Sequence, residues 1–142
     1  MFRPISLLAL TILDANSLGL PSAFRIIVAI VIFIPGAYTI FSVKKYFGFK
    51  RAAGADHFKS EYRAMPLVKE GIFKYSNNGM YLFGFFILWA VAIGFNSSAA
   101  LVVTAFSHCS IWIHFYATEK PNMDYLYEGV ARDGWADRWI RL

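Results

Sequence analysis

The sequence predicts an all-α integral membrane protein with about four transmembrane helices, a cytoplasmic loop and an interfacial C-terminal tail. The segment from Tyr75 to Thr118, 44 residues long, contains no Asp, Glu, Lys or Arg, and one helical pass needs about 20 apolar residues. Only 16% of all residues are charged, against about 25% in soluble domains. The mean hydropathy is +0.48, and the 142 residues are expected to form a single domain, 1–142.

Two spans are expected in the first third of the chain. Pro4–Leu20 is apolar apart from Asp14 and its neighbours, so two alternatives stay open, a turn over Asp14–Ser17 and a cleaved signal peptide. Ile26–Val43 is uncharged and rich in Ile and Val. The Pro35-Gly36 pair within it predicts a kink, which allows close helix approach or lines a cavity.

The segment Lys44–Lys74 is the longest polar stretch before the uncharged region. It carries eight basic and three acidic residues, and such an excess places a loop on the cytoplasmic side by the positive-inside rule. Aromatic and aliphatic residues interleave with these charges. The loop is therefore expected to fold against the membrane surface.

The uncharged region predicts an antiparallel pair of spans. Met80–Phe95 forms the third span, Asn96-Ser97-Ser98 a tight external turn, and Ala99–Thr118 the fourth span. Four spans place both termini on the cytoplasmic side. In the tail, Glu119–Leu142, a pair of tryptophans spaced four residues apart, Trp135 and Trp139, predicts an interfacial helix.

Composition excludes several function classes. Cys109 is the only cysteine, so no internal disulfide forms, and one cysteine with three scattered histidines gives no metal-ligand spacing. The net charge of +5 comes from basic residues beside apolar spans. Such residues orient the chain and attract anionic lipid headgroups, so nucleic acid is not an expected partner.

Two polar clusters flank the predicted hairpin and are expected to meet at one membrane surface. The first runs from Gly71 to Tyr81 and contains Asn77, Asn78 and Gly79, and the second runs from Glu119 to Tyr127. A carboxylate neutralises a cationic group, and amides bind polar edges of a ligand. Aromatic faces near both clusters attract cations; these rings belong to Tyr75, Tyr81, Trp112, Phe115 and Tyr116.

Helical periodicity places His108, Trp112, Phe115 and Glu119 on one face of the fourth span, while His114 points elsewhere. His108 lies about 16 Å from Glu119 along the axis, at 1.5 Å per residue. We interpret both histidines as packing residues of the bundle.

The chain resembles membrane-embedded methyltransferases, namely the phosphatidylethanolamine N-methyltransferases and the related isoprenylcysteine carboxyl methyltransferases. Asn78-Gly79-Met80-Tyr81 is similar to the Asn-Pro-Met-Tyr of the phospholipid enzymes, with Gly for Pro. Glu119-Lys120-Pro121, followed by Tyr127, is similar to their Glu-Glu-Pro and later Tyr. Tyr46-Phe47-Gly48 also looks like the family. The resemblance covers about residues 44–129.

This resemblance implies S-adenosylmethionine as cofactor and a lipid-like acceptor that enters from the bilayer, expected to be a phospholipid headgroup amine. The implied cofactor-binding residues are Asn77, Asn78, Gly79, Met80, Tyr81 and Glu119, and Glu119 is also the implied catalytic residue; no metal is expected. Asn77-Asn78-Gly79 stands where the carboxyl-methylating branch has Arg-His-Pro, which favours the amine-methylating branch. The site is expected on the cytoplasmic side.

Two other function classes stay open. Lys120 replaces the second glutamate of the family motif and Gly79 its proline, a pattern that also fits a non-catalytic membrane subunit that kept the scaffold within a larger assembly. A small transporter subunit that packs as a homo-oligomer ranks last, because polar residues are scarce along the middle of the spans.

Overall fold

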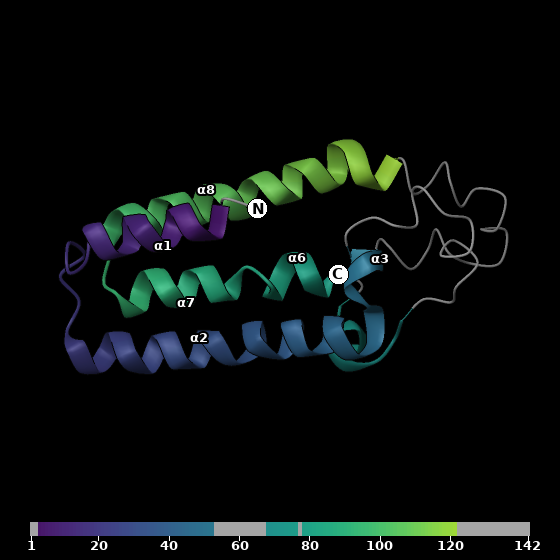
Figure 1. The fold of residues 1–142 in the computed structure, drawn as a ribbon, viewed down its shortest axis with the longest axis horizontal. Helices are drawn as coiled ribbons and strands as arrows, with labels where there is room; N and C mark the ends of the chain where they lie inside the picture. Colours follow the sequence, from purple (N-terminus) through teal and green to yellow (C-terminus); the bar gives the residue numbers. More distant parts are fainter. Residues whose placement is uncertain (1–2, 53–67, 77, 122–142) are drawn as a thin grey trace, which may run out of the picture.

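The protein is a bundle of helices in which segments distant in sequence lie side by side (Figure 1). The computed structural model describes residues 3–52, 68–76 and 78–121, and all regular structure in these ranges is helical. In order, the elements are α1 (Arg3–Leu13), α2 (Ser22–Ser42), the π-helical turn η1 (Val43–Phe47), α3 (Phe49–Ala52), the 3₁₀ turn η2 (Gly71–Lys74), α6 (Gly79–Phe83), α7 (Phe86–Gly94), α8 (Ser98–His114) and the π-helical turn η3 (Phe115–Glu119). The α6–α7 row lies between α2 and α8, and α1 contacts α7 and α8.

Two helices in the described part of the chain are long and apolar enough to cross a bilayer. These are Ser22–Phe47, with 26 residues, and Ser98–Glu119, with 22 residues, while Gly79–Gly94 is a shorter apolar helix. The outward face of α2 exposes large apolar side chains, for example Ile27 and Ile34, each 62% exposed. Such a face suits a lipid environment, because the exposed apolar side chains would contact hydrocarbon and not water. The second and fourth expected spans thus lie within helices that extend a few residues beyond the predicted bounds; the total of four spans stays a prediction.

The first expected span is shorter than predicted. α1 has 11 residues, about 16 Å of helix, and the chain turns at Asp14–Leu18 instead of continuing as a helix to Leu20. The turn that was the alternative interpretation of Asp14–Ser17 is therefore confirmed. The chain turns here because the Asp14 carboxylate accepts hydrogen bonds from residues at the start of α8.

The turn after α1 and the turn after α7 are fastened together by Asp14. Its Oδ2 accepts hydrogen bonds from Ser97 Oγ at 2.7 Å, from the Ala99 backbone N–H at 2.9 Å and from Ser17 Oγ at 2.7 Å. These donors, with Ser97 the strongest, hold the pKa of the Asp14 carboxyl below its ordinary value. An acid near the first turn of α8 also complements the positive end of the helix dipole.

Backbone contacts extend this junction. Asn16 donates its N–H to the Phe95 carbonyl at 3.1 Å, and Leu18 donates to the Asn96 carbonyl at 2.9 Å. Asn16 and Asn96 both adopt positive φ, 66° and 62°, which asparagine tolerates better than most residues. The turn predicted between the third and fourth spans is confirmed at Asn96 and Ser97, and Ser97 caps α8, which begins at Ser98, by accepting from Ala100 N.

α2 and α7 approach each other closely at Gly36. A Cβ placed on Gly36 would lie 2.7 Å from Ile87 Cγ1 and 2.9 Å from the Ile87 backbone nitrogen. The close helix approach expected from Pro35-Gly36 is therefore present. α2 runs as one helix past Pro35 to Ser42.

The third expected span is divided into α6 and α7 at Gly84-Phe85. A Cβ on Gly84 would collide with the Met80 carbonyl oxygen, so this position needs glycine. The interruption between α6 and α7 was not predicted, because an apolar run that contains one glycine predicts a continuous helix.

A small core positions the start of α6. Val43, Ile72 and Phe73 are buried together, with Met80 and Phe83 packed against them. Ser42 Oγ donates to the Tyr38 carbonyl at 2.8 Å and accepts the Ile72 N–H at 3.1 Å. Gly71, at φ 62°, lies so close to Ser42 that a Cβ would meet its Oγ at 2.5 Å. η2 is thereby fixed to the end of α2, immediately before α6.

Candidate functional site

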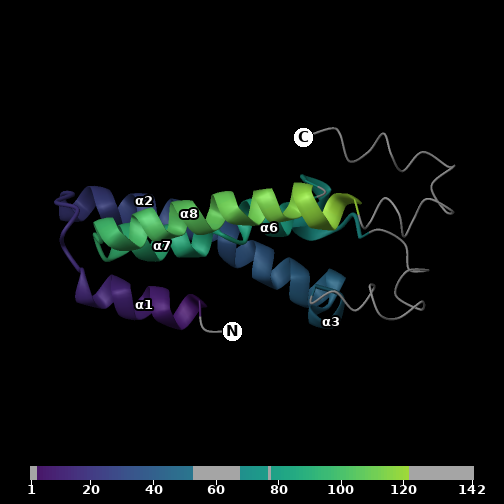
Figure 2. The same cartoon turned by 90° about the horizontal axis from the view of Figure 1, so that it is seen from above.

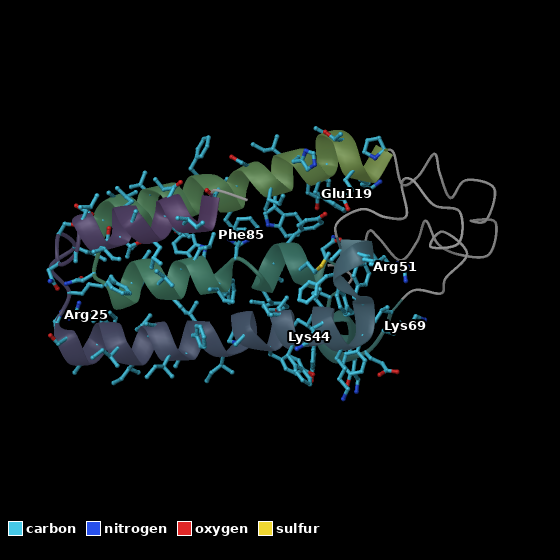
Figure 3. The ribbon with its side chains drawn as sticks, in the orientation of Figure 1. Arg25, Lys44, Arg51, Lys69, Phe85 and Glu119 are labelled. Atoms are coloured by element: carbon cyan, nitrogen blue, oxygen red, sulfur yellow. The ribbon has the colours of Figure 1, made fainter. Side chains whose placement is uncertain are left out.

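The two predicted polar clusters meet through Tyr81 and Glu119. The Tyr81 hydroxyl, on α6, donates a hydrogen bond to Glu119 Oε2, on η3, 38 residues away in sequence. Both groups lie at the end of the bundle where α2, η2 and α8 also end, and Figure 3 shows Glu119 pointing inward from that end. The hairpin therefore brings an acid and a phenol from separate motifs into direct contact, as the sequence predicted for its two ends.

Aromatic rings surround this contact. The Tyr81 ring lies 5.4 Å from the Phe115 ring and 6.5 Å from the Trp112 ring, centroid to centroid. Tyr116 stacks on Trp112 at 6.0 Å, with an angle of 25° between the planes. Ring faces attract cations, and more strongly where water is excluded. A half-buried carboxylate among such rings suits a ligand that carries positive charge.

Two of the segments that carried the resemblance form π-helical turns. In η1 the Gly48 N–H donates to the Val43 carbonyl at 2.7 Å, and in η3 the Lys120 N–H donates to the Phe115 carbonyl. π-turns widen a helix locally and occur frequently at functional sites. They coincide here with Tyr46-Phe47-Gly48 and with Glu119, and no sequence pattern had predicted them.

Asn78 precedes α6 without capping it through its side chain. Its carbonyl accepts the N–H groups of Tyr81 and Leu82, each at 3.0 Å, but the amide makes no capping hydrogen bond. The side chain is half-buried. The Asn78 side chain therefore does not cap α6. Asn77, its predicted partner, lies outside the described residues.

Gly79 and Met80 turn toward the protein core. A Cβ on Gly79 would lie 3.1 Å from Ile72 Cγ2, so the missing side chain makes room for Ile72. Met80 packs against the cluster of Val43, Ile72 and Phe73. These contacts position α6; cofactor binding by either residue stays a prediction.

His108 is a packing histidine with both ring nitrogens engaged. Trp89 Nε1–H donates to His108 Nδ1 at 3.1 Å, so Nε2 is the nitrogen left to donate to the Tyr81 carbonyl, 3.0 Å away. The ring also stacks on Phe85 at 5.0 Å. The helical-face analysis placed His108 correctly, but its bond to the Tyr81 backbone depends on the helix break, which the sequence did not reveal.

Several other predicted residues lie away from the contact or outside the described ranges. Tyr75 is 74% exposed and His114 is exposed. Lys120 is half-buried directly after Glu119. The expected tail features, Tyr127, Trp135 and Trp139, fall in residues 122–142, outside the described part. No cluster of His, Cys, Asp or Glu in the described ranges fits a metal ion.

Taken together, the fold and this contact define a membrane-associated helical protein with an acid–phenol pair at one end of an apolar bundle. The model of a family described as phospholipid methyltransferase matches residues 24–129, about three-quarters of the chain. The chain therefore belongs to the phospholipid methyltransferase family, whose members are membrane methyltransferases that act on lipids. No curated protein and no solved structure gave a significant match.

Proposed function

We propose that this protein transfers a methyl group from S-adenosylmethionine to a lipid in the membrane, with the amine of a phospholipid headgroup as acceptor. The observation that carries the proposal is the hydrogen bond from Tyr81 to Glu119. It joins the two family motifs across the hairpin and leaves an acid among aromatic rings at the end of an apolar bundle. When bound, the cofactor supplies a sulfonium-activated methyl group.

The donor set fits such a cofactor. Its ammonium and sulfonium are cationic, and a carboxylate has about four lone-pair sites, so Glu119 can accept from Tyr81 and still bind an ammonium group. Trp112 and Phe115, whose ring centroids lie 6.1 Å apart, offer faces to a cation. The side-chain amide of Asn78, which does not cap α6, offers a donor and an acceptor to the polar end of the ligand.

The chain must also orient the acceptor and handle a proton. A headgroup ammonium has to lose a proton before its nitrogen can attack, and the Glu119 carboxylate is the base we assign to that role. Tyr81 holds the carboxylate in place through its hydroxyl. The surrounding rings give the site apolar walls, and a site poor in water favours a displacement with nucleophile, methyl and leaving group in line.

Isothermal titration calorimetry of the full chain in detergent tests cofactor binding. The wild type should bind S-adenosylmethionine and its demethylated product. Glu119→Gln should weaken binding by about tenfold or more, because a charged hydrogen-bonding partner is lost, and Tyr81→Phe should weaken it less. Glu70→Gln removes an exposed carboxylate and serves as the matched control, with unchanged affinity.

Lipid mass spectrometry of cells with and without the protein then tests the acceptor. One lipid class should gain one or more methyl masses with the wild type and not with Glu119→Gln. The absence of cofactor binding by the wild type at millimolar concentration would remove the enzyme proposal. If cofactor binding is absent and Glu119→Gln leaves the cellular role intact, the non-catalytic subunit replaces the enzyme.

A further inference from the structure

A groove of about 560 Å³ lies between α2 and α7, at the end of the bundle opposite Tyr81 and Glu119. Figure 3 shows Arg25 at this end and Glu119 at the other. The groove is polar at Arg25 and apolar along the rest of α2 and α7, where its walls include Ile26, Ile30, Phe33, Val91 and Phe95. It is thus separate from the site of the proposed methyl transfer.

Arg25 brings a positive charge to the groove, and the described residues that line the groove include no acid. Nη1 donates to the Gly94 carbonyl at 3.3 Å and to Asn16 Oδ1 at 3.1 Å, both neutral acceptors. Nε is buried and has no hydrogen-bond partner among the described residues. A buried guanidinium N–H without an acceptor is costly, so an anionic group at this place would relieve the cost.

The apolar part of the groove opens toward the lipid-facing side of α2. Ile26, Ile30 and Phe33 are 50%, 56% and 48% exposed, and they lie in a helix of 26 residues that is long enough to cross a membrane. In a bilayer, hydrocarbon rather than water fills a groove in such a face. The ligand must therefore combine an apolar chain with an anionic group one or two helical turns away.

We propose that this groove binds a phospholipid, with its phosphate on Arg25 and one acyl chain along Ile26, Ile30 and Phe33. A guanidinium pairs with phosphate through a planar fork of N–H donors, and the bonds to Gly94 and Asn16 use only Nη1 of Arg25. A lipid here seals α2 against α7 from the membrane side. The lipid belongs to the leaflet remote from the Tyr81–Glu119 contact, so it is a structural ligand and not the acceptor.

The test is native mass spectrometry of the full chain in detergent, titrated with dioleoyl phosphatidylglycerol. We expect one tightly retained lipid per chain for the wild type. Dioleoylglycerol, which has the same chains and no phosphate, should be retained at least about tenfold less, as expected for loss of a charged hydrogen-bonding partner. Arg25→Lys should keep part of the affinity, and Arg25→Gln should lose it.

A groove-filling variant separates lipid binding from any effect of Arg25 on folding. Ile30→Trp places a large ring in the groove and should displace the lipid. Ile27→Trp is the matched control, because Ile27 lies on the same helix and is 62% exposed but does not line the groove; it should retain the lipid. Equal retention by both tryptophan variants, or equal retention of both lipids, would overturn the proposal. So would a wild-type dimer that Ile30→Trp converts to a monomer, because a second copy would then fill the groove.

Discussion

At the scale of single residues, Tyr81 links three elements through its two ends. Its hydroxyl donates to Glu119 on η3, and its carbonyl lies 3.0 Å from His108 Nε2 on α8. The carbonyl is available because the helix is interrupted after Phe83. The position of the phenol is thereby coupled to the packing of His108, so a histidine far from the acid still orients the site.

Replacing His108 by Leu should destabilise the protein by about 1–2 kcal/mol, because the Trp89 N–H and the Tyr81 carbonyl would each lose a partner. The measurement is the free energy of unfolding in mixed detergent micelles. His114→Leu is the control, since His114 is exposed on the same helix, and it should stay within about 0.5 kcal/mol of the wild type. Equal losses for the two variants would contradict the assigned role of His108.

The sequence predicted that the two ends of the hairpin meet, but it did not predict that Tyr81 contacts Glu119 or where every neighbouring side chain points. Two motifs at the ends of one hairpin must come to the same end of a bundle, whatever the details of packing. Gly79 and Met80 share the motif with Tyr81 yet contact Ile72 and its cluster. Which residues of a five-residue helix face inward depends on the elements packed around it, and η2 is not visible as a helix in the sequence.

At the scale of helices, α2 and α7 lie side by side in Figure 1 and overlap in the view of Figure 2, and their contact rests on a close backbone approach at Gly36. Gly36→Ala should destabilise the protein by about 1–3 kcal/mol, because its Cβ would lie 2.7 Å from Ile87 Cγ1 and force the helices apart. Gly94→Ala is the matched control.

The control has a clear expected result. A Cβ on Gly94 would meet only the Ala29 Cβ, at an ordinary 3.5 Å, and alanine favours a helix by about 1 kcal/mol over glycine. Gly94→Ala should therefore leave stability unchanged or raise it. Both variants are measured by the same unfolding assay, and a tolerated Gly36→Ala would mean that α2 and α7 are less tightly packed than the structure shows.

The junction of α1 with α8 should make stability sensitive to acid. The folded-state pKa of Asp14 lies below its unfolded value, because Ser97, Ser17 and the Ala99 N–H bind the charged form. This contribution is fully present above the unfolded pKa of about 4 and is lost as the pH falls through the folded pKa. Thermal unfolding between pH 7 and pH 2.5 should show a drop below about pH 4 that is smaller in Asp14→Asn. Glu70→Gln, which removes an exposed carboxylate, should keep the drop.

Helix extents were predictable where the apolar run alone decides them. Ile26–Val43 and Ala99–Thr118 each lie within a described helix, because long uncharged runs have to satisfy their backbone groups internally. The prediction of a continuous span over Pro4–Leu20 was wrong from Asp14 onward, because the Asp14 carboxylate has partners 83 and 85 residues away. The break at Gly84 and both π-turns were not predicted for the same reason. Contacts between residues far apart in sequence accompany these features, and no local sequence pattern indicates such contacts.

At the scale of the whole molecule, the bundle has two different polar ends. One is fastened by hydrogen bonds from Ser97 to Asp14, from Leu20 to Asn96 and from Asn16 to Phe95. The other carries the Tyr81–Glu119 contact, the two π-turns and the basic residues that follow α2. Since the first end holds the helices together by many short contacts, variation at the second end can serve chemistry without loosening the bundle.

The difference between the two ends of the bundle gives a prediction about membrane orientation. Cysteines introduced in a Cys109→Ala background at Lys74 and Ser22 should react with a membrane-impermeant maleimide from opposite sides. Both residues are exposed; Ser22 begins α2, and Lys74 ends η2, which is bonded to the far end of α2. The excess of basic residues in Lys44–Lys74 predicts that Lys74→Cys reacts only from the cytoplasmic side. Pro121→Cys, two residues after Glu119, should label together with Lys74→Cys, because both ends of the hairpin lie at one end of the bundle. Labelling of Lys74→Cys and Pro121→Cys from opposite sides would separate Tyr81 from Glu119 by a membrane, and the proposed site could not exist.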